Sequence, residues 1–150
     1  MLRLQPLLKA EITLAAAQEL GDTPVGRRRI IPITGGRFDG ERMSGRVLPG
    51  GADWQVIRAD GVADLDARYT LETADGALIY VRNKGYRHGP AAVMERLRAG
   101  EAVDPALYYM RTTPWFETGD ARYAWLNGMV CVATGARRAA AVELDVFEVK

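Results

Sequence analysis

A carboxylate and a guanidinium stand two residues apart at Asp66 and Arg68, within a run that alternates polar and apolar residues. Side chains at positions i and i+2 of a β-strand share a face. In a partly polar cavity the two would hold each other charged. Asp66 could then exchange a proton with a substrate, and Arg68 could hold an anionic group. In the alternative interpretation this polar face meets water and the apolar face fills the core.

A second group of candidates lies downstream. Arg111 could grip a carboxylate with two parallel hydrogen bonds, and Glu117 could act as a general base. Trp125 offers a flat apolar wall, and Asn127 on the same face could bind a carbonyl or a hydroxyl group. The structural alternative is a satisfied hydrogen-bond network after Pro114, with Trp125 in the core.

Two more aromatic residues could shape the wall of such a cavity. Trp54 follows a Pro-Gly-Gly turn and Asp53. In the structural alternative the Asp53 side chain only caps this turn. Tyr80 shares a face with Arg82 on the next predicted strand. The sequence therefore predicts catalytic roles for Asp66 and Glu117, and binding roles for a wider set: Trp54, Arg68, Tyr80, Arg111, Trp125 and Asn127.

The chain lacks the signatures of common cofactor sites. His88 is the only histidine and Cys131 the only cysteine, so a zinc site would need carboxylates from elsewhere. We expect His88 in a turn or at the surface and Cys131 as a small buried hydrophobe. Asp53, Asp66 and Glu117 could bind a hard cation if they converged, but their spacing does not require it. No Gly-Lys-Ser/Thr follows a glycine pair, and we expect no cofactor and no metal.

Length and charge bound the remaining possibilities. The 150 residues fit one domain, and 20 basic against 19 acidic residues leave a formal charge of +1. Such a balance disfavours nucleic acid or an anionic membrane surface as a partner. No apolar run approaches the roughly 20 residues of a transmembrane helix, and the N-terminal apolar run is interrupted by Lys9 and Glu11. The expected location is the cytoplasm.

Period-two alternation and turn residues dominate the chain. They predict short strands, with hairpin turns at Asp60-Gly61 and Asp75-Gly76. Residues 15–20 have helical propensity and stay ambiguous. One helix is expected over about residues 90–99, between Pro90 and Gly100. The predicted strands cover residues 7–14, 27–34, 45–48, 54–59, 63–73, 77–84, 108–113, 123–134 and 141–149.

Eight or nine short strands with short connections indicate an antiparallel meander. Closure of the meander removes two exposed edges, so we favour a single up-and-down β-barrel over a sandwich for residues 1–150. A barrel of this size either fills its interior with side chains or holds one small ligand.

The turns and their flanks also resemble the domain-of-unknown-function 3237 family, also called uncharacterised protein family 0311. The resemblance covers roughly residue 26 to the C-terminus and implies a small β-barrel, with no established activity, cofactor or catalytic residue. The chain has Met110 where an aromatic residue is common in that family, and Gly128 where a larger polar residue is usual. Both differences could alter a pocket. The motifs that carry the resemblance are residues 28–36, 48–54, 65–71, 75–83, 87–90, 108–114, 116–118 and 123–127.

Two functions follow from these observations. The first is a barrel that binds a small apolar or anionic molecule in a partly polar cavity, with a cofactor-independent lyase, isomerase or cyclase as its enzymatic form. The second is a non-catalytic structural or interaction barrel that assembles as a homo-oligomer.

Overall fold

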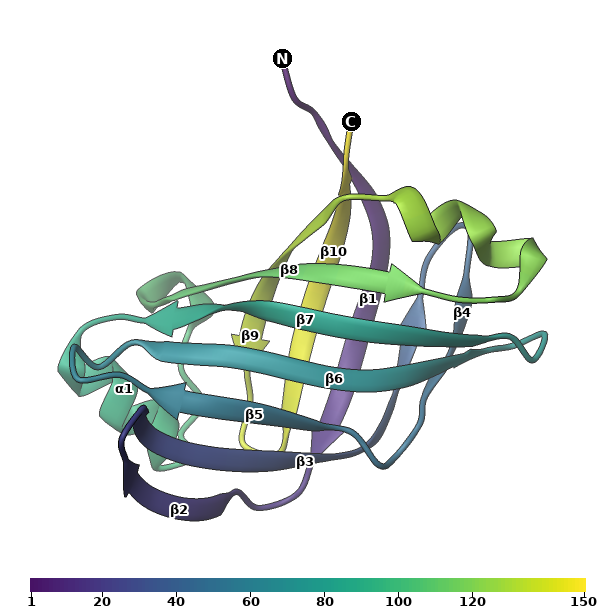
Figure 1. The fold of residues 1–150 in the computed structure, drawn as a ribbon. Coiled ribbons are helices and arrows are strands. Elements are labelled where there is room, and N and C mark those ends of the chain that lie inside the picture. The colour runs from purple at the N-terminus through teal and green to yellow at the C-terminus, as the bar shows by residue number, and fades with distance from the viewer.

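The computed structural model describes residues 1–150, which form a closed antiparallel barrel of eight strands with two extra strands (Figure 1). The barrel was preferred to a sandwich from the sequence, and this prediction is confirmed. The strands are β1 (Leu4–Leu14), β2 (Gln18–Thr23), β3 (Gly26–Asp39), β4 (Ser44–Val47), β5 (Ala52–Ile57), β6 (Ala63–Thr73), β7 (Leu78–His88), β8 (Tyr109–Glu117), β9 (Cys131–Arg137) and β10 (Ala141–Val149).

Most strands pair with their neighbours in the chain, as short connections require. β6, β7, β8, β9 and β10 follow one another in the sheet, and β10 pairs with β1. β1 also pairs with β3, and β3 returns to β6 through β4 and β5, so the sheet closes. The closed sheet leaves the eight wall strands without a free edge.

The long strand β3 turns the corner that closes the barrel. Its first half pairs with β5 and its second half with β1 and β4. The sequence predicted that Gly35-Gly36 would end this strand, but the strand continues to Asp39. Gly36 has φ +132°, and a Cβ there would collide with the carbonyl oxygen of Glu11 on β1. The glycines therefore bend the strand and let β1 approach closely.

In two segments the structure corrects or settles what the sequence predicted. The strand predicted over 123–134 is wrong at its start, because residues Ala121–Gly128 form a 3₁₀ helix, η2. The Asp120 side chain accepts from the backbone N–H of Arg122 and caps this helix, while Tyr123 and Leu126 bury one side of it. The ambiguous segment after residue 15 forms β2 rather than a helix.

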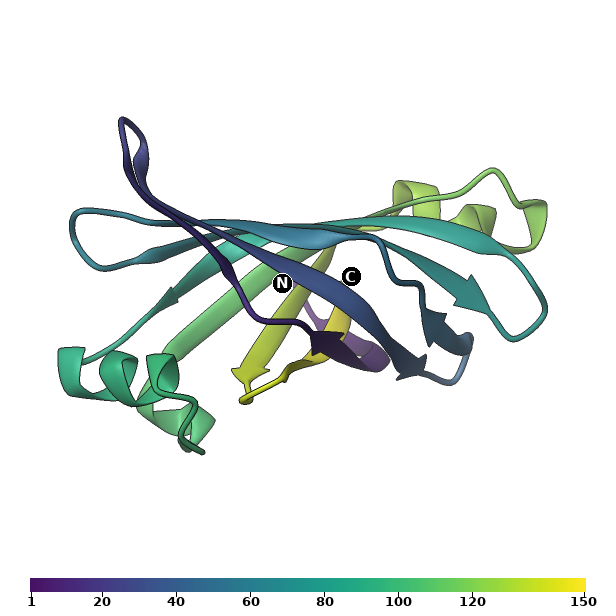
Figure 2. The ribbon, with the colours of Figure 1, turned by 90° about the horizontal axis from the view of Figure 1, so that it is seen from below.

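The expected helix is present as α1 (Ala91–Arg98), which begins after Pro90. A short 3₁₀ helix, η1 (Pro105–Leu107), follows it. α1 and η2 lie at opposite ends of the barrel in both views (Figures 1 and 2). No helix has the length and apolar character needed to cross a membrane.

The barrel interior is filled mainly at the η2 end. Large apolar side chains there form one continuous core cluster, and Leu126 and Ile79 within it are fully buried. A smaller cluster of Ala63, Leu65, Val103, Tyr108 and Met110 lies under α1. Between the two clusters, toward the α1 end, the interior is not completely filled.

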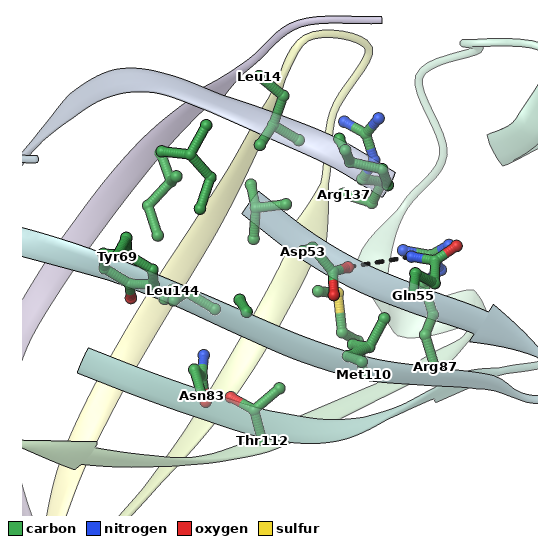
Figure 3. Close-up of a pocket in the computed structure, with 16 residues that line it drawn as sticks. Leu14, Asp53, Gln55, Tyr69, Asn83, Arg87, Met110, Thr112, Arg137 and Leu144 are labelled. Carbon is green, nitrogen blue, oxygen red and sulfur yellow. Dashed lines mark hydrogen bonds between the residues drawn. The ribbon is translucent and has the colours of Figure 1, made fainter. Parts of the chain in front are cut away.

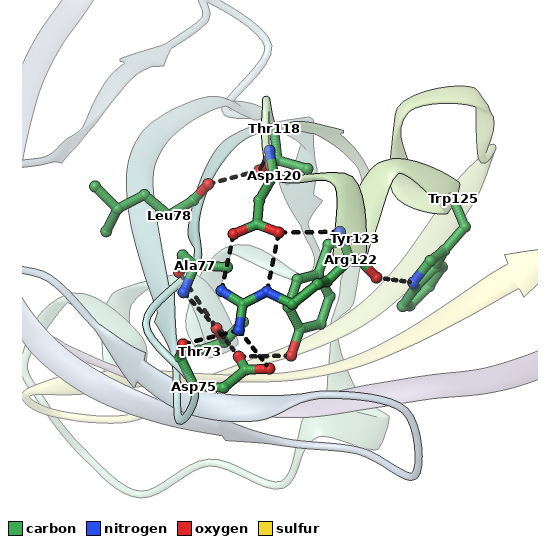
Figure 4. A network of polar contacts seen from close by, with 9 residues as sticks. All are labelled: Thr73, Asp75, Ala77, Leu78, Thr118, Asp120, Arg122, Tyr123 and Trp125. Atoms are coloured by element: carbon green, nitrogen blue, oxygen red, sulfur yellow. Dashed lines mark hydrogen bonds and ion pairs between the residues drawn. The ribbon is translucent and has the colours of Figure 1, made fainter.

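A polar network fastens η2 to the turn between β6 and β7 (Figure 4). The Asp75 carboxylate accepts hydrogen bonds from the Thr73 hydroxyl at 2.6 Å and the Tyr123 hydroxyl at 2.8 Å. Arg122 pairs with Asp75 at 3.2 Å and with Asp120 at 2.9 Å. These contacts hold the 3₁₀ helix against the barrel end and keep that end closed.

Candidate functional site

A cavity of about 50 Å³ lies in the α1 half of the barrel interior (Figure 3). Apolar side chains make most of its wall, including Tyr69, Met110 and Leu144. Against this wall stand the polar residues of the cavity, which we call the lumen polar group: Asp53, Gln55, Asn83, Arg87, Thr112 and Arg137.

Strand alternation places these side chains inside. On β7 the inward face carries Ile79 and Val81, both essentially buried, and continues through Asn83 to Arg87. On β8 Thr112 lies between two buried positions of the same face, Met110 and Pro114. Polar side chains therefore occupy positions that the alternation reserves for the core.

Asp53 is the only carboxylate of the lumen polar group. One carboxylate oxygen accepts from the backbone N–H of Asp66 at 2.9 Å, and the other accepts from Nε2 of Gln55 at 3.2 Å. Gln55 is completely buried and accepts from Nη1 of Arg29 at 2.9 Å. Desolvation raises the pKa of Asp53, against the lowering effect of these hydrogen bonds. The group is thus fixed in position and holds its proton more firmly than an exposed aspartate.

Arg87 and Arg137 bring positive charge to the same end of the cavity. Arg87 is 8% exposed as a residue, and its side chain makes no hydrogen bond or ion pair within the chain. Burial and the neighbouring charge of Arg137 lower the pKa of Arg87 to about 10, so the guanidinium stays charged at neutral pH. Nη1 of Arg137 donates to backbone carbonyls, among them that of Ala141 at 3.1 Å, and burial lowers its pKa as well.

Two residues that line the cavity each have a buried polar atom without a hydrogen-bond partner: Oδ1 of Asn83 and Oγ1 of Thr112. Their residues lie on the adjacent strands β7 and β8, one diagonal step apart in the register. Tyr69 faces the same space, and burial raises the pKa of its hydroxyl, which therefore stays protonated. Buried polar atoms are almost always paired, so these atoms mark a place where another molecule could bind.

The structure answers which face of β6 lines the barrel. Leu65 and Tyr69 are buried inside, whereas Asp66 and Arg68 lie on the outer surface. Asp66 pairs there with Arg68 at 3.3 Å and with Arg82 at 3.4 Å. Desolvation opposes ionisation of Asp66, but the hydrogen bonds from Arg68 and Arg82 prevail and lower its pKa. The expected Asp–Arg pair exists, but it stands outside the cavity.

Four other candidates also lie on the outer surface of the barrel. Trp54 and Tyr80 are each 38% exposed, and the guanidinium of Arg68 lies 5.9 Å from the Trp54 ring centre. Arg111 donates to the carbonyl of Met110 and faces outward on β8, as does Glu117 at the end of that strand. The structure does not bring these four side chains together in the barrel interior.

The last two candidates, Trp125 and Asn127, lie on η2. The Trp125 ring packs against the core. The Arg42 guanidinium lies over this ring, with Cζ 3.6 Å from the ring centre. Asn127 accepts from the backbone N–H of Thr118 at 2.8 Å and donates to the carbonyl of Thr118 at 2.9 Å. Both contacts match the structural alternative, a hydrogen-bond network beside the core.

Other singled-out residues behave as structural groups. Cys131 is buried, which raises the pKa of its thiol to about 11, and this confirms the prediction of a small buried hydrophobe. The ring of His88 stacks on Tyr109 with 4.7 Å between ring centres, at the exposed end of β7. No three His, Cys, Asp or Glu side chains converge as metal ligands.

The sequence contained a signal for the residues that were missed. Asn83 and Arg87 share their strand face with Ile79 and Val81, and polar residues on an otherwise apolar face are unusual. The sequence pointed to Asp53 as a turn cap and as one of three carboxylates that could bind a cation, but not as an acid–base group. No comparable signal identifies Arg137, because its place in the cavity depends on how β9 meets β5 and β7 across the barrel.

Comparisons with known proteins agree with this fold. A UPF0311 protein of Bradyrhizobium diazoefficiens is 52% identical over 129 residues, which cover 86% of this chain and 84% of that protein. The crystal structure of a protein of unknown function from Rhodopseudomonas palustris is 43% identical, with a TM-score of 0.95 over 100% of this chain and 98% of that chain. A beta-barrel like protein from Acinetobacter baumannii is 47% identical, with a TM-score of 0.88 over 100% and 97% of the two chains.

A more distant structure is that of an enzyme from Penicillium herquei. It is 23% identical, with a TM-score of 0.74 over 99% of this chain and 95% of that chain, and it shares the fold. The family model described as "Protein of unknown function (DUF3237)" matches residues 2–149. The chain therefore belongs to the DUF3237 family, which confirms the resemblance seen in its sequence motifs.

Proposed function

We propose that the chain binds a small molecule in the cavity beside the lumen polar group, and that Asp53 exchanges a proton with it. The observation that carries this proposal is the pair of unpartnered buried atoms, Oδ1 of Asn83 and Oγ1 of Thr112. A buried polar atom without a partner costs about 1–3 kcal/mol. A ligand hydroxyl or amide that donates to Asn83 and pairs with Thr112 would remove this cost, which favours binding at this position.

Asp53 has the properties of an acid–base group. Its carboxyl faces the cavity, two hydrogen bonds fix its orientation, and desolvation raises its pKa. A carboxyl whose pKa is moved toward the working pH can both give and take a proton. The reaction classes that such a group serves without a cofactor are those of a lyase, an isomerase or a cyclase. The Penicillium herquei enzyme supports an enzymatic role as a case of catalysis on the same fold.

The size of the cavity limits the bound group. One buried water needs roughly 10–15 Å³, and the cavity measures about 50 Å³. It therefore admits a small polar head, while the rest of a larger ligand extends toward the α1 end. Met110 can widen the space, because its unbranched thioether side chain has several rotatable bonds and adapts easily.

Ligand screening by NMR tests the proposal. Small hydroxy and oxo compounds are titrated into the full chain, and the side-chain amide of Asn83 and the methyl group of Thr112 are followed, with the exposed Gln18 amide as the internal reference. We expect binders that shift Asn83 and Thr112 and leave Gln18 unchanged. For a compound that is turned over, Asp53→Asn should lower kcat about 10²–10⁴-fold and retain binding. Binders that shift only outer-surface residues would contradict the proposal.

A second candidate is a non-catalytic barrel that pairs with another copy of itself. Its support is the outer surface of β7 and β8, where Trp115 is 55% exposed and Tyr80 38% exposed. Basic Arg82 and acidic Glu117 share this surface, so a two-fold axis could pair opposite charges around the aromatic rings. Sedimentation of wild type and Trp115→Ala tests it: a dimer that dissociates in the variant supports this role, and a wild-type monomer excludes it.

A further inference from the structure

Arg87 is the least compensated charge of the molecule. Arg87 stands at the end of β7 and is 8% exposed as a residue, and its guanidinium has neither a hydrogen bond nor an ion pair within the chain. Arginine carries five N–H donors, and a buried charge is normally paired. Arg87 lines the cavity, at the edge where Gln55 stands in Figure 3, and none of its donors meets an acceptor of the chain.

The charges around Arg87 do not neutralise it. Arg137 and Arg29 are both close enough to depress ionisation of Arg87, and Asp53 is the one carboxylate that favours it. Arg29 has its own partner, Glu19 at 2.9 Å, whereas Arg137 meets only backbone carbonyls. Two guanidinium groups, Arg87 and Arg137, thus share a single carboxylate that is already bound by Gln55 and by the backbone of Asp66.

These two arginines also stand where the cavity meets the outside. A second cavity of about 120 Å³ lies under α1, and Arg87 and Arg137 line both cavities. Met94 and Leu97 of α1 cover this outer space, and Arg98 adds a further positive charge to its wall. An anion that enters under α1 meets positive charge along the route and reaches Arg87 at the boundary of the two spaces.

We propose that Arg87 and Arg137 form an anion subsite that binds the carboxylate of a small organic acid. The inference rests on the proposed function, because the rest of the acid occupies the cavity beside Asn83 and Thr112. A planar carboxylate matches the fork of N–H donors on a guanidinium and can accept two parallel hydrogen bonds from it. The ligand class is therefore a small molecule with a carboxylate at one end and a hydroxyl or carbonyl near Asp53.

Matched pairs of probes test the subsite: acetate with acetamide, glycolate with glycolamide, and lactate with lactamide. Each is titrated into the full chain, with the Nε–H signal of Arg87 and the side-chain amide of Asn83 as NMR readouts. We expect the carboxylates to bind at least about tenfold more tightly than their amides. Arg87→Met should abolish this preference and Arg87→Lys should retain part of it, while the control Arg82→Met, on the outer surface, keeps it in full.

The outcomes separate the subsite from the proposed function. Equal affinity of carboxylates and amides, with Asn83 shifted by both, would overturn the anion subsite and leave the binding cavity standing. A carboxylate preference that survives in Arg87→Met would also overturn the subsite. If no probe of any pair shifts Asn83, the binding cavity itself is contradicted.

Discussion

Arg87 and Asp53 face the same cavity and carry opposite charges, yet they form no ion pair. The oxygens of Asp53 are occupied by Gln55 and by the backbone N–H of Asp66, and Arg87 is left with unused donors. In a structural salt bridge the two groups would satisfy each other. Their separation leaves an acid–base group and an anion-binding group at adjacent places in the barrel interior.

The raised pKa of Asp53 predicts a pH-dependent cost in stability. Below the ordinary value of 3.8 the carboxyl is protonated in both states. As the pH rises through the interval up to the folded-state pKa, the unfolded chain releases the proton first, so the free energy of unfolding falls. Asp53→Asn removes this pH-dependent decrease in the free energy of unfolding, although the variant also loses the hydrogen bond from Gln55.

The measurement is urea unfolding of wild type and Asp53→Asn from acid to neutral pH. Carboxylates with lowered pKa that lie away from Asp53, such as Asp75 and Asp120, contribute equally to both proteins, so the difference between the curves reports Asp53. We expect the variant to gain stability relative to wild type as the pH rises. A difference that stays constant with pH would show that Asp53 ionises normally.

Thr112→Val should cost no stability. The Thr112 hydroxyl is buried without a partner, and valine has nearly the same shape. Removing an unsatisfied buried group is expected to leave the free energy of unfolding unchanged or to raise it by about 1 kcal/mol. The matched control is Thr113→Val on the outer face, which loses a hydrogen bond of 3.2 Å to the carbonyl of Lys84 and should lower stability slightly. A loss above about 1 kcal/mol in Thr112→Val would mean that this hydroxyl is structurally paired.

Tyr123→Phe tests the network that closes the η2 end. The variant removes the hydrogen bond of 2.8 Å from the Tyr123 hydroxyl to Asp75 and keeps the packing of the ring. We expect the free energy of unfolding to fall by about 0.5–1.5 kcal/mol at neutral pH. Hydrogen bonds from Thr73 and Tyr123 lower the pKa of Asp75, so this loss should shrink as the pH falls and Asp75 becomes protonated.

Probe binding in the cavity should be the same in Tyr123→Phe as in wild type, because η2 and α1 lie at opposite ends of the barrel. Chemical denaturation at pH 7 and in acid, together with a glycolate titration at pH 7, checks both points. A loss of stability that is equal at both pH values would contradict the role assigned to Asp75.

Much of the fold could be predicted from the sequence because its signals are local. Alternation defined β6 and β10 at both ends, the Asp-Gly pairs marked two turns, and the Pro90–Gly100 interval contained α1. The errors have local causes as well. Gly36 bends β3 where a glycine pair usually ends a strand, and the Asp120 cap turns the segment before β9 into a 3₁₀ helix.

The site was harder to predict because alternation does not say which face is inside. On β6 the choice between Asp66 and Leu65 stayed open, and the structure places Leu65 inside. The informative positions were polar residues on an apolar strand face, such as Asn83, which follows Ile79 and Val81 on the inner face of β7. Arg137 and Arg87 come together across the barrel only because the whole sheet closes, and the sequence of a single strand does not predict their proximity.

The stability of Arg87→Met tests most directly whether this end of the barrel is built for a ligand. In the free protein Arg87 is a buried charge with no hydrogen bond or ion pair within the chain, so its replacement by the unbranched, apolar side chain of methionine should raise the free energy of unfolding by about 1–3 kcal/mol. The control Arg82→Met loses only an exposed ion pair with Asp66, so it should change the free energy of unfolding by no more than about 0.5 kcal/mol. A rise in stability with loss of carboxylate binding is the predicted result, whereas a fall in stability would show that Arg87 is a structural group and would contradict the account.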